Sequence, residues 1–278
     1  MGFTVGIAGL GLMGGSLAKA FHAQEDIQVL GFDRDETVLS RAKLQEATDG
    51  CLTEENISEC DYIFIALYPK ATIEFVEKNA PYIGKNTVVV DCAGTKRAVC
   101  ESCFAAAKKH GFRFIGGHPM AGTQFSGFRY SRASMFDKAN MILVPDKDEK
   151  IETLEALKAL LVKIGFRGIT ITTAEQHDEI IAFTSQLAHV VSNAYVKSPN
   201  AKIHKGFSAG SYRDLTRVAR LNAEMWTELF LENGDNLANE IDCIVSELKK
   251  YSAAIKKNDA DKLCALLAEG SKLKESID

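Results

Sequence analysis

Three glycines, Gly9, Gly11 and Gly14, follow directly after an apolar run from Phe3 to Ala8. In that context the first glycine permits a tight turn, the second lets the backbone approach a pyrophosphate, and the third lets a new helix pack against a sheet. The N-terminus of that helix offers N–H groups and a partial positive charge to phosphates. The pattern therefore predicts a dinucleotide site, the alternative being a structural glycine turn in another α/β protein.

An acid, Asp33, ends the next expected strand, Ile27 to Phe32. A carboxylate there can hydrogen-bond both ribose hydroxyls of NAD and would repel the 2′-phosphate of NADP. We therefore expect NAD, and the neighbouring Arg34 keeps NADP as the less favoured alternative. The expected cofactor-binding residues are Gly9, Leu10, Gly11, Leu12, Met13, Gly14, Asp33, Arg34 and Leu67.

A histidine, His118, lies in a glycine-rich segment just after the predicted strand Phe112 to Ile115. Open α/β sheets bind ligands beyond the carboxyl ends of their strands, and Pro119 would fix the turn there. Enzymes that oxidise an alcohol need a base for the hydroxyl proton as hydride leaves, and histidine titrates in the right range. A lone histidine is more often structural, but this position favours a catalytic base.

Cations gather in one part of a chain whose net charge is −4. Lys197, Lys202, Lys205, Arg213, Arg217 and Arg220 lie there with one acid, Asp214. The cluster is either a solvated basic face or a site for an anionic substrate. A continuous helix over residues 212–232 would place Arg213, Arg217 and Arg220 on one face.

Two further polar patterns occur near the start of the helical half. Ser185, His189 and Asn193 recur every four residues on an otherwise apolar helix. Buried polar groups need partners, so this stripe either satisfies itself or a neighbouring helix, or it meets a ligand. The adjacent His177 and Asp178 are interpreted as a helix cap or surface pair rather than a catalytic dyad.

The elements that must position these residues fall into two classes. Strand and helix patterns alternate up to residue 172, which predicts a mainly parallel sheet covered on both faces. Beyond it only helical patterns occur, over residues 174–197, 212–232, 235–256 and 259–275. We therefore predict an α/β fold with a Rossmann-type dinucleotide-binding domain, residues 1–172, and an all-α substrate and dimerisation domain, residues 173–278. The expected strands are 3–8, 27–32, 62–67, 87–90, 112–115, 141–144 and 168–172.

Composition narrows the function classes. The net charge of −4 argues against nucleic acid as a main partner, and no apolar stretch reaches the length of a membrane span. The first strand begins at Phe3, which leaves no room for a removable presequence, so we expect a cytoplasmic protein. Residues 181–196 are apolar almost all round, as in a subunit interface or core, and we expect a homodimer.

The seven cysteines are scattered, and we expect free thiols. Cys100 and Cys103 are spaced as a CxxC, but they fall within a probable helix without a second ligand pair. Core packing is therefore the favoured role for them, and we predict no metal site.

Taken together, several segments resemble the prephenate dehydrogenase family, with arogenate and cyclohexadienyl dehydrogenases as close relatives. The resemblance rests on the GLGLMGGSLAKAF opening, the GGHPMAG segment, the spacing from His177 to His189, and the YRDLTR stretch from Tyr212 to Arg217. It covers residues 4 to about 235. It implies an NAD(P)-dependent oxidative decarboxylation of a cyclohexadienyl acid on the route to tyrosine, in which the small anionic substrate prephenate would become 4-hydroxyphenylpyruvate. With the preference that Asp33 indicates, we expect the NAD-dependent reaction.

The resemblance also implies site residues. His118 matches the catalytic histidine that accepts the ring-hydroxyl proton, and Arg217 matches the arginine that holds a substrate carboxylate. Gly94 stands where many members have a serine, so that Thr95 is expected to substitute, and Gln124 stands where many have an acid. The implied substrate-binding residues are Thr95, Thr123, Gln124, His189, Gly210, Asp214 and Trp226. Trp226 matches a tryptophan of the family pocket, but on a continuous helix it would lie opposite Arg217, so both could serve one site only through a helix break or a partner subunit.

Three alternatives stay open. An arogenate-selective pocket should offer a carboxylate to the substrate ammonium, whereas the basic cluster, His189 and Gln124 favour prephenate. A β-hydroxyacid dehydrogenase would need a lysine in the helical half, and no buried candidate stands out there. A non-catalytic NAD-sensing protein is disfavoured because His118 and Arg217 are both present.

Overall fold

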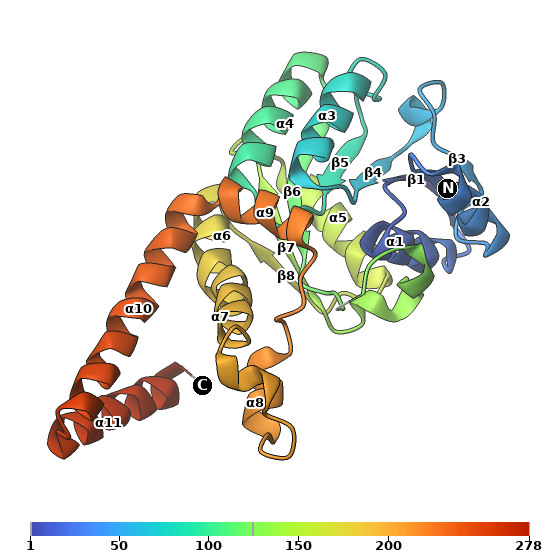
Figure 1. Ribbon diagram of the computed structural model, residues 1–278. Coiled ribbons are helices and arrows are strands. Elements are labelled where there is room, and N and C mark those ends of the chain that lie inside the picture. The colour runs from blue at the N-terminus through green and yellow to red at the C-terminus, as the bar shows by residue number, and fades with distance from the viewer. Residues whose placement is uncertain (1, 124, 278) are drawn as a thin grey trace.

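The computed structural model describes residues 2–123 and 125–277, and Gln124 therefore lies outside the described residues. An eight-stranded sheet of order β3-β2-β1-β4-β5-β6-β7-β8 forms the first part of the chain (Figure 1). Its strands are β1 (Phe3–Ala8), β2 (Ile27–Phe32), β3 (Gly50–Cys51), β4 (Tyr62–Ile65), β5 (Val88–Asp91), β6 (Arg113–Pro119), β7 (Asn140–Pro145) and β8 (Gly168–Ile171). The predicted strands are confirmed, and the two-residue β3 was too short to give a periodic signal.

The sheet is parallel except at one place, where β7 runs antiparallel to β6. Strand β8 then pairs parallel with β7. The strands β4 and β5 are buried along their whole length, as expected when helices cover both faces of a sheet. The prediction of a mainly parallel α/β sheet is therefore confirmed.

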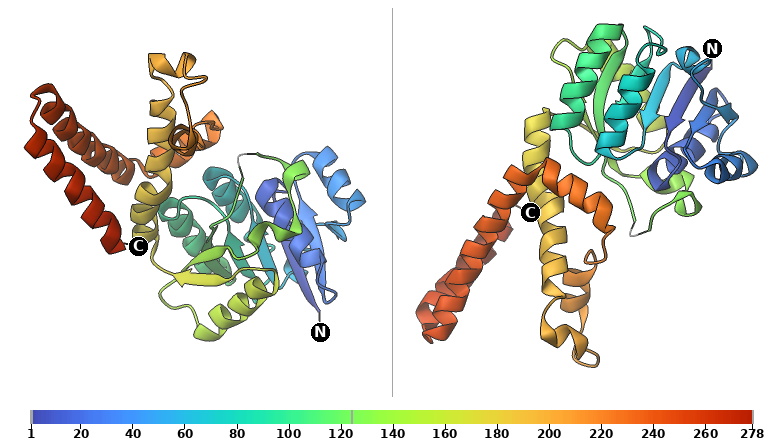
Figure 2. Two further views of the ribbon diagram at one scale, coloured as in Figure 1. Left: turned by 90° about the horizontal axis from the view of Figure 1, so that it is seen from below. Right: turned by 45° about the horizontal axis from the view of Figure 1, so that its top comes forward.

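Helices cover the two faces of the sheet with two separate cores (Figures 1 and 2). One core joins α1 (Leu12–His22) and α5 (Ile151–Lys163) to inward side chains such as Phe64. The other joins α3 (Pro69–Asn79) and α4 (Arg97–His110) to the opposite face, where Ile63 lies. Neighbouring residues of one strand thus serve different cores, because side chains alternate across a strand. The shorter α2 (Glu36–Leu44) packs against β2, the strand next to the edge strand β3.

The second part of the chain is helical. It contains α6 (Ala174–Ile181), a π-helical segment (Ala182–Leu187), α7 (Ala188–Tyr195), α8 (Gly210–Thr216), α9 (Ala223–Glu232), α10 (Gly234–Lys256) and α11 (Ala260–Ile277). Figure 1 shows α10 and α11 as a hairpin that projects away from the sheet. The two-part fold class is thus confirmed, while the exact division at residue 172 stays a prediction.

One predicted helix is broken. Residues 212–232 are not continuous, because α8 ends at Thr216 and α9 begins at Ala223. Asn222 starts α9, since its side-chain Oδ1 accepts a hydrogen bond from the Met225 N–H at 3.2 Å. The expectation that Arg213, Arg217 and Arg220 share one helix face was therefore wrong.

The structure describes the environment of the CxxC cysteines and the character of the helices. Cys100 and Cys103 are buried free thiols in the core between α4 and the sheet, which confirms a packing role. Among residues 2–123 and 125–277, no helix combines the length and apolar character that a membrane crossing needs. The same described residues contain no group of three or more His, Cys, Asp or Glu side chains that could hold a metal ion.

Two glycines of the β1–α1 turn should respond differently to substitution. A Cβ at Gly14 would lie 1.8 Å from the backbone oxygen of Gly9, whereas a Cβ at Gly11 would meet nothing within 4 Å. We expect Gly14→Ala to lower the free energy of unfolding by about 2 kcal/mol or more. The control Gly11→Ala should change it by less than about 0.5 kcal/mol. Denaturant unfolding measures both, and equal stability of the two variants would contradict the packing role of Gly14.

Candidate active site

The glycine turn forms an open cradle at the start of α1. Gly9 has a φ of +87°, which favours glycine, and its N–H donates to the Phe32 backbone oxygen at 2.7 Å. No side chain caps the N-terminus of α1 at Gly11, and the space beside Gly11 is empty. A helix N-terminus next to open space is what a pyrophosphate requires, so the chain fits a dinucleotide there.

Asp33 is held at the edge of this cradle. Its carboxylate accepts the Leu10 N–H at 2.8 Å and the Asp35 N–H at 3.0 Å. Leu67, which follows β4, packs beside the turn, because a Cβ at Gly9 would come within 2.7 Å of its Cδ2. Arg34 is exposed beside Asp33. The structure thus brings the predicted cofactor residues to one end of the sheet.

His118 lies within β6 and not after it. The strand continues through Pro119, and His118 pairs with Ile142 of β7. A Cβ at Gly117 would lie 2.3 Å from the Asp91 backbone oxygen, and one at Gly116 would lie 2.6 Å from the Cys100 sulfur. The glycines therefore let β6 pass close to its neighbours, and the expectation that this segment lies after the end of the strand was wrong. His118 itself is half-buried.

Behind His118 lies a chain of hydrogen bonds that the sequence did not predict. Nδ1 of His118 is 2.9 Å from Nε2 of His177, and Nδ1 of His177 is 2.7 Å from Oδ1 of Asp178. Asp178 also accepts the backbone N–H groups of Lys96 at 2.7 Å and Arg97 at 2.9 Å, at the N-terminus of α4. His177 and Asp178 are both at most 2% exposed, so the interpretation as a surface pair was wrong. Asp178 does act as a helix cap, but for α4 of the sheet domain.

The environment sets the protonation of these groups. Burial raises the pKa of Asp178, but hydrogen bonds from His177 and from the Arg97 and Lys96 N–H groups outweigh it and leave that pKa below its usual range. Burial, and then the nearby His177 and Lys96, hold the pKa of His118 well below its usual range. Burial also lowers the pKa of His177, although Asp178 opposes it. At neutral pH both imidazoles are therefore uncharged.

The hydrogen-bond pattern then assigns the tautomers. An ionised carboxylate only accepts, so His177 donates from Nδ1 to Asp178 and leaves Nε2 as an acceptor. His118 must donate to that acceptor from its own Nδ1. The other ring nitrogen of His118, Nε2, carries a lone pair and has no partner among the residues that the structure describes. It is available as a base.

A buried ion pair lies next to the row formed by His118, His177 and Asp178. The Lys96 ammonium contacts the Asp91 carboxylate, and both side chains are fully buried. Asp91 also accepts the N–H groups of Gly117 at 2.9 Å and Ala93 at 2.8 Å. The pair thus joins the end of β5, the His118 segment of β6 and the start of α4. In the sequence its only signal is an acid at the end of an apolar strand.

Helix α9 lies over the carboxyl-terminal edge of the sheet. Thr95 donates from Oγ1 to Oε2 of Glu232 at 2.5 Å, and the Lys70 N–H at the start of α3 donates to Glu228 at 2.8 Å. Leu229 fills the space next to Gly94, where a Cβ would come within 3.3 Å of it. Thr95 is only 2% exposed, so its hydroxyl is engaged by α9 rather than open to a ligand.

The helix break brings three predicted substrate residues together within one subunit. The rings of His189 and Trp226 lie 3.9 Å apart between centroids. His189 Nδ1 is 3.2 Å from the Val218 backbone oxygen, and after burial the charge of Arg217 is a further cause that lowers the pKa of His189. Asn193 donates to the Ala219 oxygen at 3.1 Å, so the polar stripe of α7 satisfies the segment between α8 and α9.

The remaining predicted residues lie elsewhere or carry no such contacts. Asp214 is exposed in α8, and its carboxylate lies 3.9 Å from Arg213. Gly210 begins α8. Thr123 is exposed, and its hydroxyl accepts the Phe125 N–H at 3.3 Å. Sequence reasoning missed the contributions of His177, Asp178, Lys96, Asp91 and Glu232.

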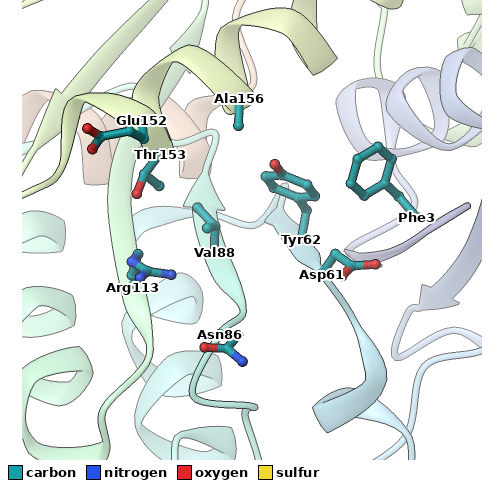
Figure 3. Close-up of a pocket in the computed structure, with 9 residues that line it drawn as sticks. All are labelled: Phe3, Asp61, Tyr62, Asn86, Val88, Arg113, Glu152, Thr153 and Ala156. Atoms are coloured by element: carbon teal, nitrogen blue, oxygen red, sulfur yellow. The ribbon is translucent and has the colours of Figure 1, made fainter. Parts of the chain in front are cut away.

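A separate pocket opens at the other end of the sheet (Figure 3). It is lined by the first residues of four strands, Phe3, Tyr62, Val88 and Arg113, and by Thr153 and Ala156 of α5. His118, Thr95 and the glycine turn all lie at or beyond the carboxyl ends of their strands. The pocket is therefore not part of the candidate active site.

Family models match both parts of the chain. Residues 17–170 match the model described as prephenate dehydrogenase, nucleotide-binding domain, and residues 173–269 match prephenate dehydrogenase, dimerization domain. A cyclohexadienyl dehydrogenase from Zymomonas mobilis is 30% identical over 98% of this chain and 95% of that protein.

Solved structures agree in fold. The Aquifex aeolicus prephenate dehydrogenase in complex with hydroxyphenyl propionate and NAD+ has a TM-score of 0.85 at 26% identity, covering 100% of this chain and 99% of that one. Synechocystis arogenate dehydrogenase has a TM-score of 0.82 at 25% identity, covering 99% of this chain and 100% of that one. A 3-hydroxyisobutyrate dehydrogenase from Mycobacterium tuberculosis is similar at 18% identity, with a TM-score of 0.55 over 77% of this chain and 70% of that one, which shows a shared fold alone.

Proposed function

The chain belongs to the prephenate dehydrogenase family, and we propose that its reaction is the NAD-dependent oxidative decarboxylation of prephenate to 4-hydroxyphenylpyruvate. Members of this family are nicotinamide-dependent dehydrogenases. The family match therefore favours this reaction over the two alternatives, a β-hydroxyacid dehydrogenase and a non-catalytic NAD-sensing protein. The observation that carries the proposal is the uncharged His118, whose free Nε2 lies at the end of the sheet where the glycine turn also opens.

NAD is the proposed cofactor. The glycine turn and the N-terminus of α1 would hold its pyrophosphate, and the Asp33 carboxylate would accept its ribose hydroxyls. A 2′-phosphate at Asp33 would meet a negative charge, which disfavours NADP. When bound, the nicotinamide accepts a hydride from the substrate ring.

His118 is the proposed base. As hydride leaves the ring carbon, the hydroxyl on that carbon becomes a carbonyl and releases its proton to Nε2 of His118. Loss of CO₂ then delivers the electrons that make the ring aromatic. The uncharged state of His118 suits this step, because a protonated imidazole could not accept the proton.

Arg217, with His189 and Trp226, is the proposed binding site for the substrate carboxylates. A guanidinium never loses its charge at working pH and can orient the carboxylate that leaves as CO₂. Trp226 packs on His189 and so supplies an apolar wall for the ring. Arogenate is the alternative substrate, and prephenate is favoured because the basic residues and His189 suit an anion rather than the ammonium of arogenate.

A homodimer is the proposed assembly. The second family model is described as a dimerization domain. Apolar side chains of the α10–α11 hairpin are exposed in the single chain, among them Leu248 at 59% and Ile255 at 62%. Leu248 and Ile255 are seven residues apart and therefore lie on one face of α10, and a helix face with exposed apolar side chains suits a subunit contact.

Steady-state kinetics test the choice of substrate. We expect kcat/KM to be higher with prephenate than with arogenate, and higher with NAD than with NADP, measured as reduced nicotinamide formed. Arg217→Ala should raise KM for prephenate at least tenfold, because an Arg–carboxylate contact contributes roughly 1.5–3 kcal/mol. The matched control is Arg213→Ala, which removes an exposed arginine from α8 and should leave KM within about twofold. Higher kcat/KM for arogenate, or an unchanged KM in Arg217→Ala, contradicts the respective assignment.

Substitution of the base tests the mechanism. His118→Asn should lower kcat by roughly a hundredfold or more, because asparagine cannot accept the proton. NAD affinity, measured by fluorescence titration, should stay near that of the unmodified protein. The control His110→Asn changes a histidine at the end of α4 and should leave kcat unchanged. If His118→Asn turned over at the rate of the unmodified protein, the assignment of His118 as the base would be refuted.

A further inference from the structure

His118 is the outer member of a hydrogen-bonded row that crosses between the two parts of the fold. It lies on β6, whereas His177 and Asp178 lie on α6 of the helical part. The two contacts of the row are short: 2.9 Å between Nδ1 of His118 and Nε2 of His177, and 2.7 Å between Nδ1 of His177 and Oδ1 of Asp178. Both nitrogens of His177 are thus engaged in the row, whereas His118 keeps Nε2 for a substrate. Proton transfer along such a row needs no movement of heavy atoms.

The proton balance of the proposed reaction bears on this row. Prephenate dianion and NAD+ become 4-hydroxyphenylpyruvate anion, CO₂ and NADH without net release of a proton. The proton that leaves the ring hydroxyl must therefore be stored while the ring carbon is a carbonyl, and it must return to the same oxygen when the ring becomes aromatic. Storage on His118 alone is costly, because burial and nearby charges hold its pKa well below the usual range and the Asp178 carboxylate contacts the ring of His177, not that of His118.

Resting on the proposed function, we infer that His177 and Asp178 form a proton relay with His118 and hold the substrate proton during hydride transfer. The ring O–H bond breaks and its proton binds Nε2 of His118. The Nδ1–H proton of His118 moves to Nε2 of His177, which becomes an imidazolium beside the Asp178 carboxylate. The charge is thus carried next to an anion, and the same two transfers run backwards when the phenolate oxygen takes its proton back.

The charges around the row favour storage on His177. Asp178 faces it directly at 2.7 Å. Lys96 lowers the pKa of both imidazoles, but it is paired with Asp91, whose charge raises the pKa of His177. Arg97, whose backbone N–H binds Asp178, directs its guanidinium mainly at Asp235 of α10 and lies 3.4 Å from Asp178 through Nε. Glu232 of α9 is half-buried, and burial raises the pKa of its carboxyl, so storage on His177 does not depend on its charge.

His177 and Asp178 are positioning residues, because they act through His118 without touching the substrate. The row also fixes the tautomer of His118, since Nε2 of His177 only accepts and so keeps the His118 proton on Nδ1. Two roles, fixing the tautomer and storing the proton, are therefore separable by substitution. Glutamine at position 177 has an amide oxygen that can accept from His118 but cannot take up a proton.

His177→Gln is the first test, assayed on the full-length protein with prephenate and NAD. We expect kcat to fall at least tenfold, while NAD affinity and the unfolding midpoint stay close to those of the unmodified protein. Normal kcat in His177→Gln, with the same pH profile as the unmodified protein, would overturn the relay. If the variant does not fold, the next pair of variants decides.

Asp178→Asn and Asp235→Asn form that pair, since each removes one carboxylate that contacts Arg97 but only Asp178 belongs to the row. Asp178 stabilises the protonated row, so its loss should lower the plateau of kcat/KM and move the acid limb of the pH profile to lower pH by about one unit. Asp235→Asn should leave the acid limb in place. An acid limb that does not move in Asp178→Asn would show a purely structural role and overturn the relay.

Failure of the relay can be told apart from failure of the proposed function. If the unmodified protein forms no NADH from prephenate or arogenate, the proposed function fails and the relay with it. If the unmodified protein is active and the position 177 and 178 variants keep its pH profile, the function stands and the relay alone is refuted.

Discussion

The buried carboxylate of Asp178 is the interaction on which the rest of the site depends. It belongs to the helical part, yet it accepts the N–H groups of Lys96 and Arg97 that open α4 on the sheet. Those N–H groups have no partner within their own helix, and the positive end of the helix dipole favours the anion. The same carboxylate orients His177, which orients His118. Docking of the two parts and orientation of the base are therefore one event.

This constraint also explains why helical elements crowd the carboxyl end of the sheet. Asn233 donates to the Asp178 backbone oxygen at 2.7 Å and to Gln186 at 2.8 Å, so the end of α9 is tied to α6 and to the π-helical segment. Helix α9 then lies over the loop after β5, with Glu232 on Thr95. The first turn of α9 carries Trp226, whose ring packs on His189 of α7. A buried polar network of this kind is stable only when its members are satisfied.

Much of the fold could be predicted because its signals are local. The strands are short apolar runs, and the glycine turn with Asp33 is a pattern whose geometry is fixed by neighbours in sequence. The contacts of His177 could not be predicted in this way, because a polar pair at the start of a helix is usually solvated and its partner on β6 is distant in the chain. Gly116 and Gly117 misled for the same reason, since the close approach of Cys100 and Asp91 that requires them is tertiary. The break before α9 has one local signal in the sequence, Asn222, which is a favourable residue type for the start of a helix.

The central claim is that Asp178 and His177 hold His118 with its proton on Nδ1 and a free lone pair on Nε2. Nitrogen-15 NMR of the histidine side chains in the unmodified protein at neutral pH tests it most directly, with His118→Asn and His177→Gln used to assign the signals. The account predicts neutral rings for both residues, each protonated at Nδ1, and an unprotonated Nε2 on His118. A His118 ring protonated at Nε2, or a charged His177 in the resting protein, would contradict it.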